Sequence, residues 1–112
     1  MKLYHLVASP EWQAAQAAGE YRPASLAREG FIHLSTAAQW VGAANRFYRG
    51  RTDLLLLEVD ADRLSAEVRF EAADGDRFPH LYGPMDLEAA RVACALTPDA
   101  SGAFTDPRPA EQ

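Results

Sequence analysis

The chain has 112 residues, of which 48% are hydrophobic, and a formal net charge of -5. This length supports one domain with a hydrophobic core and is too short for two. The acidic balance excludes a broad basic surface for bulk nucleic acid, so any nucleotide ligand is expected to be a small molecule or a strand end held by a local arginine cluster. The single cysteine, Cys94, excludes an internal disulfide, and the N-terminal residues are too few and too polar for a signal-peptide core. We therefore predict a cytoplasmic protein with no membrane-spanning segment.

The N-terminal residues predict a strand followed by a helix. Residues 3–7 alternate in side-chain character, which favours a strand with His5 on one of its faces. The next segment, Pro10 to Ala18, has a proline suited to the first turn of a helix, and Gly19 predicts the helix end. Residues 26–29 then predict a turn or a single helical turn that leads to Gly30.

The stretch from Gly30 to Gln39 is predicted to change from strand to helix. Residues 31–34 form a short, mostly apolar run that favours a buried strand, and a T-x-x-Q capping box begins at Thr36. Such a corner brings the last strand side chains and the first helical N–H groups to one rim, which could bind an anion or a sugar edge. His33 lies just before this rim. Ser35 and Thr36 are candidates for ligand binding or, as an alternative, for capping the helix.

The second half of the chain predicts further strands. Helical spacing of apolar residues indicates a helix from Thr36 to about Tyr48, and the apolar run between Asp53 and Asp60 is typical of a central strand covered on both faces. Residues 68–71 alternate as a strand before a hairpin-type turn at 74–76. Two prolines and a glycine predict a rigid loop over residues 77–84. Residues 86–96 are predicted to form a helical turn and then a strand.

The three histidines, His5, His33 and His80, are the strongest candidates for chemistry. They could line one cleft, or each could be a core or edge residue satisfied by backbone hydrogen bonds. Three imidazoles could bind zinc, but no two of them have the spacing that supplies two ligands from one element, so we expect no metal. The apolar neighbours of Cys94 indicate a packing cysteine. Arg46 belongs to a small basic cluster that could meet a phosphate.

Three motifs in the chain resemble signatures of the DUF952 family: His5 in Leu3-Tyr4-His5-Leu6, the stretch Gly30 to Thr36, and the stretch Phe78 to Pro84. This resemblance implies an α+β fold that is a compact form of the ADP-ribosyltransferase fold, with two small antiparallel sheets around a cleft and two main helices. The single domain would span residues 1–98. Residues 99–112 are rich in turn formers and are expected to form a partly disordered tail.

The resemblance also implies roles for the histidines. In that superfamily, whose RNA 2'-phosphotransferase branch is the most similar, His5 matches a residue that contacts NAD and His33 matches one that packs against nicotinamide. His80 lies where a catalytic glutamate is common. A glutamate stabilises positive charge at the ribose carbon, whereas an imidazole does so poorly. Transfer of ADP-ribose onto a protein is therefore not expected, while a phosphate-directed reaction remains open.

The sequence thus predicts a domain that binds NAD or a related ribonucleotide, as a monomer or weak homodimer, and that could catalyse transfer or hydrolysis at an ADP-ribosyl or phosphate group. One alternative is a binding or regulatory module that uses the same cleft without catalysis, and another is a metal-dependent hydrolase. Histidine suits acid and base chemistry because it titrates near neutral pH. The catalytic candidates are His33 and His80. The candidates for ligand contact are His5, Phe31, Ser35, Thr36, Arg46 and Tyr82.

Overall fold

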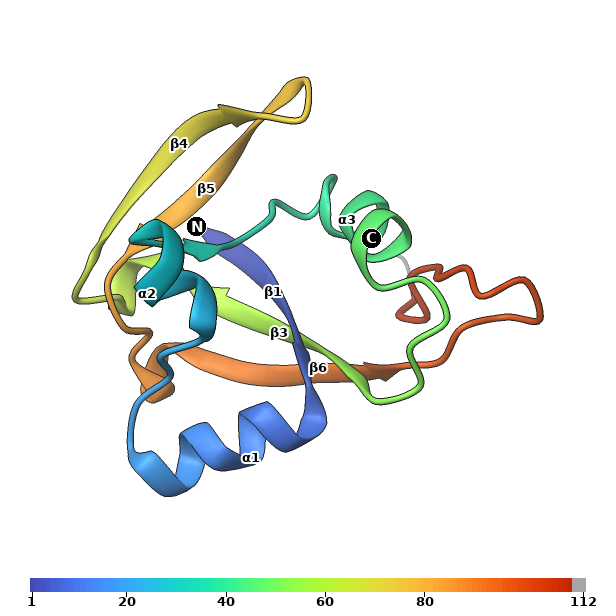
Figure 1. Ribbon diagram of the computed structural model, residues 1–112, viewed down its shortest axis with the longest axis horizontal. Helices are drawn as coiled ribbons and strands as arrows, with labels where there is room; N and C mark the ends of the chain where they lie inside the picture. The colour runs from blue at the N-terminus through green and yellow to red at the C-terminus, as the bar shows by residue number, and fades with distance from the viewer. Residues whose placement is uncertain (110–112) are drawn as a thin grey trace.

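The computed structural model describes residues 1–109 and shows an α+β protein with two three-stranded antiparallel sheets (Figure 1). The first sheet has the order β1-β3-β6 and contains β1 (Lys2–Ala8), β3 (Leu54–Asp60) and β6 (Ala90–Leu96). The second has the order β2-β5-β4 and contains β2 (Ile32–His33), β5 (Asp76–Tyr82) and β4 (Glu67–Ala73). The helices are α1 (Ser9–Ala18), α2 (Ala24–Glu29) and α3 (Trp40–Phe47), with 3-10 turns η1 (Ala61–Arg63) and η2 (Leu87–Ala89). None of the helices in the described part is long and apolar enough to cross a membrane.

The first sheet is covered on both faces, as predicted for its central strand β3. Successive side chains of β1 and β3 point to opposite faces of the sheet, and each face has its own hydrophobic cluster. The cluster on one face includes Trp12 of α1, and the cluster on the other includes Trp40 of α3. His5 lies on the first of these faces, because its ring contacts Tyr21 of the same cluster. Burial of both faces fixes the register of the strands, since a shift by one residue would exchange the two clusters.

A short segment after α2 links the two sheets. Ile32 and His33 pair with Leu81 and His80 of β5, in the second sheet. Two residues later, Ser35 and Tyr4 of β1 exchange backbone hydrogen bonds of 2.8 Å in each direction. The segment therefore passes from the second sheet to the first within four residues, and it holds the two sheets next to each other.

The helix predicted to begin at Thr36 begins at Trp40, after a turn. One half of the predicted capping box is present, because the Thr36 N–H donates to the side-chain oxygen of Gln39 at 3.0 Å. The side-chain nitrogen of Gln39 donates to the Asp76 carboxylate and to the Arg77 carbonyl oxygen on the β4–β5 hairpin. Gln39 thus ties the start of α3 to the second sheet, a contact at long range that the local pattern did not reveal.

The prediction of a rigid loop over residues 77–84 is wrong, because most of this stretch lies in β5, the central strand of the second sheet. Proline cannot donate a backbone hydrogen bond and is usually excluded from central strands. Pro79 has no N–H to donate, but the residue opposite it is Leu34, which lies just beyond the end of β2, and the Leu34 N–H donates to the Pro79 carbonyl oxygen at 3.0 Å. His80 consequently lies on a strand that is paired on both sides, a more rigid support than a loop.

Residues 99–109 belong to the segment for which partial disorder was predicted. In the structure, part of this segment contacts the hydrophobic core. Phe104 is 2% exposed and lies in the cluster with Trp40. The Asn45 side chain accepts from the Phe104 N–H at 2.7 Å and donates to its carbonyl oxygen at 2.9 Å. Arg108 also lies over the rings of Tyr4 and Trp40, so several contacts hold a segment that is otherwise rich in turn formers. The rest of that predicted tail, residues 110–112, lies outside the described residues.

Candidate functional site

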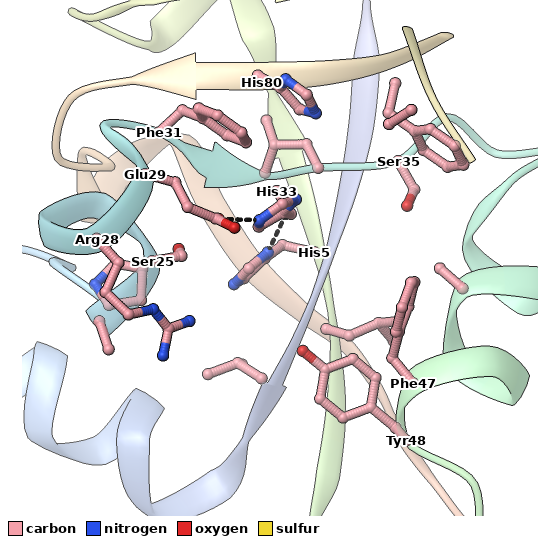
Figure 2. Close-up of a pocket in the computed structure, with 18 of the residues that line it drawn as sticks. His5, Ser25, Arg28, Glu29, Phe31, His33, Ser35, Phe47, Tyr48 and His80 are labelled. Carbon is pink, nitrogen blue, oxygen red and sulfur yellow. Dashed lines mark hydrogen bonds and ion pairs between the residues drawn. The ribbon is translucent and has the colours of Figure 1, made fainter. Parts of the chain in front are cut away.

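A cavity of about 710 Å³ lies among the two sheets, α2 and α3, and it contains the residues on which the sequence prediction concentrated. Figure 2 shows Ser25 and Arg28 on one side of the cavity and Phe47 and Tyr48 on the opposite side, with the histidines in between. The volume is within the range of roughly 300–1,000 Å³ that is usual for sites of small molecules. The cavity is therefore large enough for a nucleotide.

His5 is buried at the inner end of the site and has hydrogen bonds at both ring nitrogens. Nδ1 lies 2.7 Å from the His33 carbonyl oxygen, and Nε2 lies 2.8 Å from the Tyr21 hydroxyl. Because a carbonyl oxygen can only accept, Nδ1 carries the hydrogen and Nε2 accepts from Tyr21. Burial lowers the pKa of His5 to about 4. His5 is thus a neutral ring whose orientation the protein itself determines.

His33 lies at the mouth of the cavity and is paired with a carboxylate. Its Nε2 is 2.5 Å from an oxygen of Glu29, which ends α2. The helix stops at Gly30, whose φ of 87° turns the chain so that Glu29 faces His33. The side chains of His33 and Glu29 are 56% and 44% exposed, so both side chains are accessible to a ligand. An imidazole and a carboxylate in contact can hold and move a proton.

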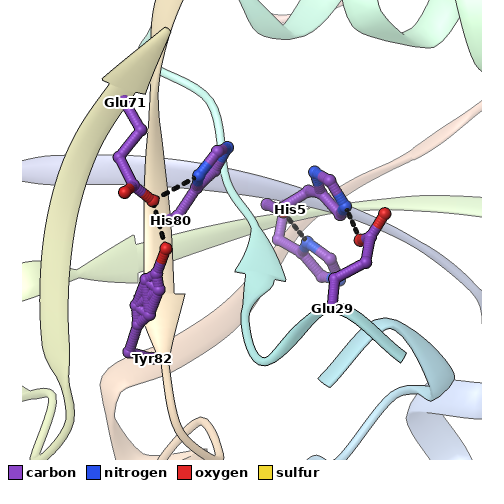
Figure 3. A network of polar contacts seen from close by, with 6 residues as sticks. His5, Glu29, Glu71, His80 and Tyr82 are labelled. Atoms are coloured by element: carbon purple, nitrogen blue, oxygen red, sulfur yellow. Dashed lines mark hydrogen bonds and ion pairs between the residues drawn. The ribbon is translucent and has the colours of Figure 1, made fainter. Parts of the chain in front are cut away.

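His80 is 4% exposed and has a carboxylate on one side of its ring (Figure 3). Its Nδ1 lies 2.9 Å from an oxygen of Glu71 on the neighbouring strand β4, and the Tyr82 hydroxyl donates to the same oxygen. The hydrogen bond from Tyr82, followed by that from His80, lowers the pKa of Glu71. The Nε2 atom of His80 has no hydrogen-bond partner among the described residues.

The aromatic ring of Phe31 connects the two histidines of the second sheet. It stacks on the His80 ring with 4.0 Å between centroids, and it forms a T-shaped pair with the His33 ring with 4.9 Å between centroids. The rings of His33 and His80 are themselves 5.5 Å apart, because these residues are directly opposite in the β2–β5 pair. Register in the sheet is what brings together two histidines that are 47 positions apart (80 minus 33) in the chain.

Five of the eight predicted site residues line the cavity: His5, Phe31, His33, Ser35 and His80. The other three lie outside its lining. Thr36 belongs to the turn before α3, Tyr82 contacts Glu71, and Arg46 forms an ion pair of 3.1 Å with Asp74 on the β4–β5 hairpin. The structure thus brings the three histidines to one site but places the basic residue that we chose from the sequence elsewhere.

Sequence reasoning missed several residues that shape the site, above all Glu29, Glu71, Tyr21 and Arg28. Glu71 could have been found if residues 77–84 had been predicted as a strand, because β4 then faces it across a hairpin. The position of Glu29 just before a glycine was a signal for a helix end facing the next strand. Tyr21 offered no local signal, since its contact with His5 depends on tertiary packing.

The charged residues of the lining are two arginines, Arg28 and Arg51, and three acidic residues, Glu11, Glu29 and Asp74. Arg28 is exposed at the mouth and has no ion pair with any of the described residues, whereas Arg51 is paired with Asp53 at 3.0 Å. Within residues 1–109, no group of three or more histidine, cysteine, aspartate or glutamate side chains is placed to hold a metal ion. The metal-dependent hydrolase considered from the sequence has no ligand set in this part of the chain.

Comparison with known proteins shows that solved structures share this fold. A crystal structure of protein CC0527 from Caulobacter crescentus is 36% identical, with a TM-score of 0.85 over 94% of each chain. A crystal structure of a double mutant of CC0527 is 35% identical, with a TM-score of 0.82 over 94% of each chain. The solution NMR structure of CC0527 is 36% identical, with a TM-score of 0.78 over 91% of this chain and 90% of the CC0527 chain. No curated protein matches the chain.

A family model supports the same relationship. The model described as "Protein of unknown function (DUF952)" matches residues 6–93, which include all of the cavity's histidines except His5 and most of its other lining residues. The match covers well over half of the chain, and it confirms the resemblance that the three motifs indicated. The chain belongs to the DUF952 family.

Proposed function

We propose that the cavity binds NAD or a related ribonucleotide, and that the chain is a compact relative of the ADP-ribosyltransferases. The observation that carries this proposal is the composition of one cavity of about 710 Å³. Aromatic rings lie on one side of it, an unpaired arginine lies on the other, and hydrogen-bonding histidines lie between them (Figure 2). A nucleotide needs these three surfaces for its base, its phosphate and its ribose.

The aromatic side of the cavity supports binding of a planar ring. Phe47 is 61% exposed, which is unusual for so large an apolar side chain at the end of a helix. It lines the cavity together with Tyr48. A nicotinamide or adenine ring that packed against these side chains would bury apolar surface that water now contacts.

The opposite side of the cavity supports binding of a phosphate. Arg28 offers a guanidinium that has no carboxylate partner among the described residues, and the half-buried Ser25 lies on the same helix. Guanidinium groups bind phosphate oxygens through paired hydrogen bonds. A dinucleotide that spanned the cavity would place its ribose next to His33 and Glu29.

The pair of Glu29 and His33 supports hydrolysis at an ADP-ribosyl group. In such a reaction the bond between the ribose carbon and nicotinamide breaks, nicotinamide leaves as a neutral molecule, and water adds to the ribose carbon. The Glu29 carboxylate would stabilise the positive charge that develops on the ribose. The proton lost by water would pass to the Glu29 and His33 pair. Glu29 thus offers the carboxylate that the sequence comparison did not find near His80.

A binding or regulatory module is the second candidate, and His5 favours it. Both nitrogens of this histidine are engaged by the protein, so His5 cannot contact a ribose without loss of its bond to Tyr21. The family resemblance implied that His5 contacts NAD. In the ligand-free state we propose instead that His5 has a structural role. A site with fewer free polar atoms is better suited to binding than to several proton transfers.

Titration calorimetry with NAD and with ADP-ribose tests the proposal. We expect both to bind, and we expect Arg28→Ala to weaken the binding of ADP-ribose by at least about tenfold, because one charged hydrogen-bond partner of a phosphate contributes roughly 1.5–3 kcal/mol. The control is Arg63→Ala, which removes an exposed arginine of η1 that does not line the cavity. Equal loss of affinity in both variants would show a general charge effect and would argue against a phosphate position at Arg28.

A further inference from the structure

The group formed by Glu71, His80 and Tyr82 is the part of the site that the proposed function leaves unexplained (Figure 3). These residues lie on neighbouring strands of the second sheet, and Glu71 accepts hydrogen bonds from both of the others through one oxygen. The pKa of Glu71 is lowered by these two bonds, so the carboxylate is charged at neutral pH. The hydrogen bond from Tyr82 holds the carboxylate in place next to the imidazole.

A charged carboxylate determines which nitrogen of His80 carries the hydrogen. Carboxylate oxygens can only accept, so Nδ1 of His80 must donate to Glu71. In the neutral ring, Nε2 then has a free lone pair and is a hydrogen-bond acceptor. The same rule fixes the ring orientation of many histidines whose second nitrogen binds a ligand.

The Nε2 atom is buried and has no partner among the described residues, although His80 lines the cavity. An unpartnered buried acceptor is costly because it has lost its hydrogen bond to water, so a protein that retains one usually gains from it elsewhere. The half-buried ring of Phe31 stacks flat on one face of the His80 ring. The Nε2 lone pair lies in the plane of the imidazole, so a ligand would have to bring its hydrogen-bond donor to the edge of the ring, beside the face that Phe31 covers.

We propose that Glu71 is a positioning residue that holds His80 with hydrogen on Nδ1, so that Nε2 selects ligands that offer a hydroxyl or N–H donor. This inference rests on the proposed function and makes it more specific, since ribose hydroxyls and the nicotinamide carboxamide are such donors. Tyr82 takes part by holding Glu71 and does not contact the ligand itself. The site would therefore discriminate against ligands that offer only acceptors at this point.

The role of Glu71 can be tested on the ligand-free protein by NMR of ¹⁵N-labelled histidine side chains, which distinguishes the two neutral forms of the ring. We expect the Nδ1–H form for His80 in the wild type and a loss of this preference in Glu71→Ala. Glu71→Gln should restore it, because the amide oxygen can still accept from Nδ1–H. Glu67→Ala is the matched control, since Glu67 lies on the same strand and hydrogen-bonds Arg69 instead of a histidine. An Nε2–H form in the wild type would overturn the inference.

The role of Nε2 can be tested with ADP-ribose as the probe. We expect ADP-ribose to shift the Nε2 resonance of His80, and we expect Glu71→Ala to weaken its binding about tenfold relative to Glu67→Ala. Unchanged affinity in Glu71→Ala would overturn the ligand part of the inference. If the wild type bound no ADP-ribose, the proposed function would fail and the ligand part with it, whereas the NMR measurement would still decide whether Glu71 positions His80.

Discussion

The free energy of unfolding should fall by about 3 kcal/mol as the pH is lowered from 7 to 4, because His5 must stay neutral in the folded protein. Its pKa is about 4 in the fold against 6.5 in an unfolded chain. The unfolded chain therefore binds a proton first as the pH falls, and each unit of pKa difference corresponds to about 1.4 kcal/mol. The stabilisation is complete above pH 6.5, is lost between pH 6.5 and 4, and is absent below pH 4.

Urea unfolding at a series of pH values measures this loss. We expect His5→Gln to remove most of the slope between pH 6.5 and 4, because glutamine does not titrate. His33→Gln is the control, since the His33 side chain is 56% exposed and has no comparable burial. A wild type whose stability did not change over this range would contradict a buried, neutral His5.

The second large effect concerns turnover. If the protein hydrolyses NAD, Glu29→Gln should lower the rate of nicotinamide release by at least about a hundredfold, which is the lower limit for loss of a positioned acid or base. The physical reason is that an amide cannot stabilise the charge on the ribose or accept a proton. Chromatography of the nicotinamide released from NAD provides the measurement.

The control for this effect is Glu88→Gln, an exposed residue of η2 outside the cavity lining, which should leave the rate unchanged. Two outcomes would separate the candidate functions. Full activity of Glu29→Gln would show that Glu29 takes no part in the reaction. Binding of ADP-ribose by a wild type that releases no nicotinamide would favour the binding or regulatory module.

The sequence predicted the elements whose signals are local. The apolar run of residues 54–57 predicted β3, and the Asp74-Gly75 turn predicted the hairpin between β4 and β5. Errors arose where a distant contact outweighs a local preference. Pro79 argued for a loop, yet its carbonyl oxygen serves as an acceptor for Leu34 in a central strand. The contact of Phe104 with the cluster that contains Trp40 likewise has no local signal in a segment rich in turn formers.

The candidate site was predictable in its histidines and not in their partners. His5 and His33 were predicted on strands and His80 on a rigid loop beside one cleft, and the structure places all three in one lining, with His80 on β5. The carboxylate partners of His33 and His80 could not be assigned from the sequence. The contact of Glu71 with His80 depends on the register of β4 and β5, and the contact of Glu29 with His33 depends on the turn at Gly30. Arg46 was chosen as the phosphate ligand from its cluster of basic residues, yet tertiary contacts pair it with Asp74.

The central claim is that the cavity among the two sheets is a ribonucleotide site, and backbone amide NMR during titration with ADP-ribose tests it most directly. We predict shifts that cluster at residues 21–35, 43–51 and 72–80, which contain most of the lining. Shifts confined to the shallow depression around residues 19–20 and 82–88 would contradict the claim, as would the absence of any shift at millimolar ADP-ribose.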